Sequence, residues 1–150
     1  MLNERILELK VLRIQPVDVF WCVINFDRMK SNSDNPVLVK SFNFAIRVVN
    51  LYKVLTNERR EYVISKQLLR SGTSIGANAK EGSRAQSKAD FYSKMSISLK
   101  EASESEYWIE LLSATDYLTD EESARLLSDC RELIRMLMSI TSTTKKSLQR

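Results

Sequence analysis

Five cationic side chains offer the clearest chemistry in this sequence. When each residue is placed 100° further round a helix, these cations fall within an arc of about 80°; they are Arg59, Lys66, Arg70, Lys80 and Arg84. Cations in such a row can contact the phosphates of a nucleic-acid backbone, which gives affinity without base specificity. The row can equally be an ordinary solvated helix face, so both interpretations are open. Aromatic side chains do not interleave with it, apart from Tyr62, which argues against a dedicated reader of single strands.

A second group of polar residues is a candidate for a buried cluster. Glu106 projects onto the apolar side of its predicted helix, while Asn78 and Glu81 lie near the end of the helix before it. A buried carboxylate needs hydrogen bonds or a cation, because otherwise it becomes protonated. We interpret the three residues as a polar lock that fixes helix register. A di-metal site is disfavoured, because helical bundles build such sites with histidine, and the sequence has none.

Other reaction chemistry finds little support. Without histidine the chain lacks the usual acid–base group at neutral pH and the commonest metal ligand. Cys22 and Cys130 lack metal-ligand spacing, and two free thiols are favoured, although a disulfide between them stays open. The glycines of residues 71–77 do not match the phosphate-loop pattern, and no G-x-S-x-G elbow occurs. We therefore expect no enzyme, no cofactor and no metal.

Long helices must position these residues. The sequence has only three glycines and two prolines, which favours helices over many short strands. We predict helices over 37–55, 59–80, 87–117 and from 119 onward, joined by short connections as an antiparallel, up-down-up-down four-helix bundle. Ser87 with Asp90 and Thr119 with Glu122 have capping-box spacing. Gly82 is expected to end the second helix in the left-handed conformation.

Apolar spacing predicts which face of each helix is buried. For the first helix the predicted stripe is Phe42, Ala45, Ile46, Val49 and Tyr52. For the second helix it is Leu68, Gly72, Ile75 and Ala79. For the third helix it is Phe91, Met95, Leu99, Ala102, Glu106, Ile109 and Ser113.

The third helix also carries a second apolar face, formed by Ile97, Trp108 and Leu111. A helix of a monomeric bundle needs one apolar face. Another chain, or the N-terminal segment, is therefore expected to cover the second face, and we favour a homo-oligomer with these residues at the subunit interface.

Charge divides the chain into two halves. Residues 40–100 hold 12 Lys or Arg and 4 Asp or Glu, a net charge of +8, whereas residues 101–138 hold 3 and 10, a net charge of −7. The halves can neutralise each other within one bundle or pair between subunits, or the basic half can bind nucleic acid.

The ends of the chain do not follow the bundle pattern. Residues 1–36 are interpreted as an N-terminal extension and polar linker, with Met29 as an alternative start and residues 1–28 as an upstream extension. The bundle covers 37–141, and residues 142–150 are expected to form a basic, disordered tail. No apolar run approaches the length of a membrane span and no signal peptide is evident, so we expect a cytoplasmic protein without a membrane partner.

A family resemblance appears in the second and third helices. The segment SKQLLRSGTSIGANAKEGSRAQSKADF, followed by KMSISLKEASESEYWIELL, resembles the four-helix-bundle family of 23S rRNA-intervening sequence proteins, to which accessory proteins of diversity-generating retroelements belong. The resemblance covers residues 40–139. It implies a cyclic pentamer and, for the accessory proteins, a role beside a reverse transcriptase and its template RNA.

Two functions are therefore carried forward. We expect a non-catalytic, oligomeric protein that binds RNA or another nucleic acid through its basic helix face. The alternative is a protein-interaction scaffold whose basic and acidic halves only assemble subunits.

Overall fold

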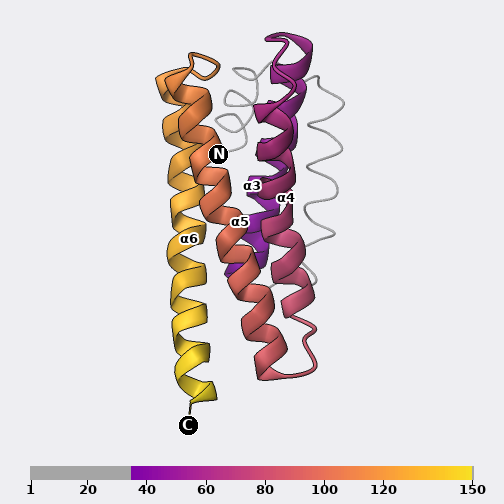
Figure 1. The fold of residues 1–150 in the computed structure, drawn as a ribbon, viewed down its shortest axis with the longest axis vertical. Helices are drawn as coiled ribbons and strands as arrows, with labels where there is room; N and C mark the ends of the chain where they lie inside the picture. The colour runs from indigo at the N-terminus through magenta and orange to yellow at the C-terminus, as the bar shows by residue number, and fades with distance from the viewer. Residues whose placement is uncertain (1–34, 150) are drawn as a thin grey trace, which may run out of the picture. The chain divides into compact units, whose positions relative to one another are not determined.

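The computed structural model describes residues 35–149, and every structural statement below concerns those residues. They form four helices and no strand: α3 (Pro36–Asn57), α4 (Ile64–Gly82), α5 (Lys88–Ala114) and α6 (Asp120–Leu148). Figure 1 shows the four helices side by side along one long axis. Each helix contacts the next in sequence, and α6 closes the ring on α3. The predicted all-α fold with four helices is confirmed. The predicted N-terminal extension, the alternative start at Met29 and Cys22 lie outside the described residues.

Local hydrogen bonds set the starts of three helices. Asn35 caps α3 by accepting the N–H of Val37 at 3.2 Å, and Pro36 occupies the first turn, where its missing N–H has no effect. At α5 the Ser87 hydroxyl accepts the N–H of Asp90, as the spacing predicts. At α6 Thr119 and Glu122 form the full reciprocal capping box.

The second helix begins later than predicted. Residues 58–63 form a connection rather than the first turn of α4, which starts at Ile64. Arg60 has a φ of 53°, in the left-handed region that a helix does not contain. Arg59 therefore does not belong to the helix that carries the other predicted cations.

The glycine that ends α4 acts through its size. No glycine has a positive φ, so the predicted left-handed ending at Gly82 is wrong. Gly82 is buried, and a Cβ on it would lie 2.7 Å from Met95 Cε and 3.2 Å from Lys94 Cβ. The missing side chain lets α5 pass close to the end of α4.

The last helix continues where a disordered tail was expected. Residues 142–148 extend α6 to Leu148, which differs from the prediction. A contact with the start of α5 accompanies this extension, because Lys88 Nζ donates to Ser147 Oγ at 3.0 Å.

The core confirms one predicted stripe and corrects two. In α4, Leu68, Gly72, Ile75 and Ala79 are buried as predicted. In α3 the buried side is one position away from the prediction, and Phe42 is 43% exposed; the buried residues are Val37, Ser41, Phe44, Val48, Leu51 and Leu55. In α5 the predicted Met95, Ala102 and Ile109 are buried, and Ser98, Ser105 and Leu112 complete the buried side. The other predicted residues are half-buried: Phe91, Leu99, Glu106 and Ser113.

Serine explains the shift in α5. Ser98 Oγ donates to the Ile75 carbonyl at 2.8 Å, and Ser105 Oγ lies 2.9 Å from Ser71 Oγ. These small polar side chains are satisfied by α4 and occupy core positions, which an apolar periodicity does not register. Leu99 and Glu106 consequently lie beside the core rather than in it.

Candidate nucleic-acid interface

The five predicted cations do not form one continuous surface. Lys66, Arg70 and Lys80 lie on the exposed side of α4, Arg84 lies in the connection after it, and Arg59 lies in the connection before it. Two of them form ion pairs, and the other three form none within residues 35–149.

Arg59 joins two connections of the bundle. Its guanidinium donates to the Tyr117 carbonyl and to both carboxylate oxygens of Glu122, at 2.8 and 3.1 Å. Burial would raise the pKa of Glu122, but hydrogen bonds from Arg59 and Thr119 outweigh it and leave that pKa below its ordinary value. Arg59 therefore serves the fold and is not placed to bind a phosphate.

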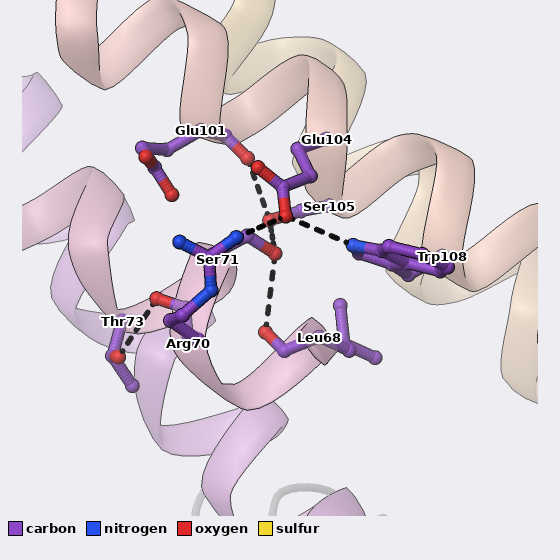
Figure 2. A network of polar contacts seen from close by, with 8 residues as sticks. All are labelled: Leu68, Arg70, Ser71, Thr73, Glu101, Glu104, Ser105 and Trp108. Atoms are coloured by element: carbon purple, nitrogen blue, oxygen red, sulfur yellow. Dashed lines mark hydrogen bonds and ion pairs between the residues drawn. The ribbon is translucent and has the colours of Figure 1, made fainter. Parts of the chain in front are cut away.

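Arg70 belongs to a network that spans α4 and α5 (Figure 2). Its Nη2 lies 2.6 Å from Glu104 Oε1, and the indole N–H of Trp108 donates to the same oxygen at 3.2 Å. One predicted nucleic-acid residue and one predicted interface residue thus share a single carboxylate. A substitution of Arg70 would disturb both surfaces, so it cannot separate the two functions.

Lys66, Lys80 and Arg84 are exposed, and none of them forms an ion pair within residues 35–149. Lys66 and Lys80 are separated by about 21 Å along the axis of α4, since a helix rises 1.5 Å per residue. These three cations are the part of the predicted row that no carboxylate of residues 35–149 neutralises.

The predicted buried polar cluster is wrong. Glu106 binds Arg131 Nε at 2.6 Å on the α6 side, with its side chain 27% exposed. Glu81 is exposed and pairs with Lys94, while Asn78 donates to the Ser74 carbonyl within its own helix. The three residues have separate partners because the core stripe of α5 runs through Ser105, one position away from Glu106.

Sequence reasoning missed a buried carboxylate at the start of α4. Glu61 is 6% exposed and accepts the N–H groups of Val63, Ile64 and Ser65 at 3.0, 2.8 and 2.6 Å. Burial would raise its pKa, but these hydrogen bonds hold the pKa below its ordinary value. The sequence feature that could have indicated this motif is Ser65, four residues after Glu61. Its hydroxyl donates a hydrogen bond to the Glu61 carbonyl.

Two further buried groups lie between the helices. Glu101 Oε2, on α5, is the one buried side-chain oxygen or nitrogen within residues 35–149 that lacks a hydrogen-bond partner. Cys130 is a free, buried thiol that donates to the Ala102 carbonyl, and burial raises its pKa to about 12. A thiol with so high a pKa is unreactive at neutral pH.

The residues predicted for a subunit interface lie along the outer side of α5. Ile97 is 37% exposed, whereas Trp108 and Leu111 are half-buried. Tyr107, which the sequence analysis did not select, is 56% exposed, and its ring meets that of Trp108 edge to face at 4.9 Å between centroids. This ring adds to the exposed apolar surface that the prediction described.

Part of the charge division is neutralised inside the bundle. Four ion pairs join the basic and acidic halves: Lys40–Glu132, Arg47–Asp129, Arg59–Glu122 and Arg70–Glu104. The described part of the chain holds no group of three potential metal ligands. None of its helices is long and apolar enough to cross a membrane.

These features define an antiparallel four-helix bundle with a cationic side on its second helix. The sequence model of the 23S rRNA-intervening sequence proteins matches residues 33–139, and the chain belongs to that family. A 1.70 Å crystal structure of a protein of unknown function from the S23 ribosomal protein family of Bacteroides thetaiotaomicron VPI-5482 is 55% identical. The match covers 70% of this chain and 97% of that one, with a TM-score of 0.69. No curated protein matches the chain.

Proposed function

We propose that this chain is a non-catalytic protein that binds RNA, or another nucleic acid, through the exposed cations of α4. The observation that supports it is the contrast within the predicted row. Arg59 and Arg70 have carboxylate partners, whereas Lys66, Lys80 and Arg84 are exposed without an ion pair among residues 35–149. An anionic ligand is the natural partner for cations that the fold does not use.

The expected binding is directed at the nucleic-acid backbone. Each cation that meets a phosphate releases a counterion, so three contacts give a log–log salt slope of about −2 to −3 per subunit. We further propose a homo-oligomer that places several such surfaces together, which would raise avidity without new contacts. Only the family resemblance supports a pentamer and a reverse transcriptase as partner.

A scaffold without nucleic-acid binding is the second candidate. The observation in its favour is the exposed apolar surface of α5, where Ile97 and Tyr107 are 37% and 56% exposed. Such a surface fits a contact with another protein chain. Under this proposal the free cations only aid solubility.

RNA binding measured against salt concentration tests the proposal. The triple variant Lys66→Glu, Lys80→Glu and Arg84→Glu should lose binding to a structured RNA by at least tenfold at low salt. The matched control reverses three exposed cations of α3 and α6, each without an ion pair within residues 35–149: Lys53, Arg135 and Lys145. It changes net charge equally and should retain most of the binding.

Either of two results would contradict the proposal. Equal losses in the two triple variants would mean that net charge, not the α4 surface, attracts RNA. Absence of binding by the wild-type protein at low salt would leave the scaffold as the better explanation.

A further inference from the structure

The connection between α3 and α4 has a fixed backbone. Arg60 is in the left-handed region, with a φ of 53°, and Glu61 turns back into the protein. The Glu61 carboxylate receives three backbone N–H groups, and the Ser65 hydroxyl binds its carbonyl at 2.8 Å. A segment held by four hydrogen bonds around one buried residue has few alternative conformations.

This connection presents two large apolar side chains to solvent. Tyr62 is 58% exposed and Val63 is 72% exposed, and neither contributes to the core. An aromatic ring on a fixed backbone loses little conformational freedom when it binds a ligand. Within residues 35–149 the core does not include these side chains, so both are accessible to a ligand.

The charges around Tyr62 select the kind of ligand. Arg60 and Lys66 are exposed, and neither has an ion pair within residues 35–149. The acids of the connection are Glu58, which is exposed, and Glu61, whose carboxylate is turned toward backbone N–H groups. Two exposed cations within four residues of one exposed ring fit a ligand with both phosphates and flat aromatic groups.

We infer that Tyr62 stacks on an unpaired base of a bound RNA strand, while Arg60 and Lys66 hold the adjacent phosphates. The inference rests on the proposed function and deepens it, because it names the nucleotide that the surface takes. One ring accommodates one base, so the chain is not a reader of long single strands. It requires an unpaired nucleotide at the Tyr62 end of the α4 surface. Every base has an aromatic face, so the site is tolerant of sequence.

The test uses the full chain with a single-stranded RNA that carries 2-aminopurine, and with the same strand in a duplex. Tyr62→Ala should weaken binding to the single strand by about 5- to 150-fold, the range that loss of one stacked base produces. Duplex binding should change less than about twofold. Quenching of 2-aminopurine should disappear in Tyr62→Ala and persist in Tyr62→Phe, which keeps the ring.

Two further variants sharpen the experiment. Phe42→Ala removes an exposed aromatic ring of α3, 43% exposed, and should leave both affinities unchanged. Arg60→Asn removes a cation, and asparagine tolerates the left-handed backbone at this position. The slope of log affinity against log salt concentration should become less negative by about 1.

The outcomes separate this inference from the proposed function. If Tyr62→Ala binds the single strand as the wild type does while the Lys66, Lys80 and Arg84 variant loses it, stacking is overturned and backbone binding stands. If the wild type binds neither RNA, both fall. If Tyr62→Ala changes the number of chains in the assembly but not the RNA affinity, the ring contacts a protein chain. The stacking assignment is then wrong.

Discussion

At the scale of single residues, Glu61 shows how a charged side chain is kept inside this bundle. The first N–H groups of a helix lack partners within the helix, and the Glu61 carboxylate accepts three of those at the start of α4. Its negative charge also lies at the positive end of the helix dipole. Both effects favour the ionised form, which explains why its pKa stays low in spite of burial.

Replacement of Glu61 by Gln should therefore destabilise the bundle. The amide keeps the size of the side chain but loses the charge-assisted hydrogen bonds, so the free energy of unfolding should fall by about 1–3 kcal/mol. Urea denaturation at neutral pH measures the change. Glu58→Gln, in the same connection but exposed, is the control and should change stability by less than about 0.5 kcal/mol.

The effect of Glu61→Gln on the free energy of unfolding should also depend on pH. The folded-state pKa of Glu61 lies below the ordinary value of 4.5 expected for the unfolded chain. Its contribution is therefore complete above that value and is lost as pH falls through the folded-state pKa. The stability difference between wild type and Glu61→Gln should shrink in acid. A difference that stays constant from pH 7 to pH 3 would show that charge is not what Glu61 contributes.

At the scale of helices, the glycines of α4 allow α3 to approach. A Cβ on Gly72 would lie 2.9 Å from Val48 Cγ2, inside the normal contact distance. A Cβ on Gly76 would lie 3.3 Å from Ser41 Oγ, which is tight but tolerable if the serine rotates. Each glycine weakens the isolated helix by about 1 kcal/mol relative to alanine. The close packing of α3 against α4 offsets this loss of helix stability.

Alanine at these two positions should have unequal effects. Gly72→Ala forces the stiff, buried Val48 to move, which costs about 1–3 kcal/mol and exceeds the gain in helix propensity. Gly76→Ala meets a smaller obstacle and should be the more stable variant. Thermal unfolding of both proteins measures the order. The reverse order would mean that the α3–α4 contact is not limited by Gly72.

At the scale of the whole molecule, the exposed side of α5 is the surface on which assembly is expected. Trp108 is a poor residue for testing it, because its ring packs against the core and binds Glu104. Ile97 lies on the same helix, is 37% exposed and leaves the core intact when changed. Its substitution therefore reports on the interface without disturbing the bundle.

If α5 forms the subunit interface, Ile97→Lys should dissociate the oligomer, because a charge buried in an apolar contact has no partner. Native mass spectrometry measures the number of chains. Ser128→Lys, at an exposed serine of α6, is the control and should leave the mass unchanged. Unchanged assembly in Ile97→Lys would place the interface elsewhere.

Short-range features were predictable from the sequence. The four helices of residues 35–149, the caps at Ser87 and Thr119 and the buried side of α4 were confirmed. Each of these depends on residues within one or two helical turns, so local hydrogen bonds and apolar spacing are sufficient to predict them.

The partners of charged and small polar side chains were decided by the tertiary structure alone. Glu106 meets Arg131, 25 residues away, and Arg70 meets Glu104, 34 residues away. Ser105 enters the core because Ser71 lies opposite it on another helix. A polar residue is stable in the core, or free for a ligand, according to which atoms of distant segments surround it. Helical periodicity contains no information on those atoms, so the accessible cations could be identified only in the folded bundle.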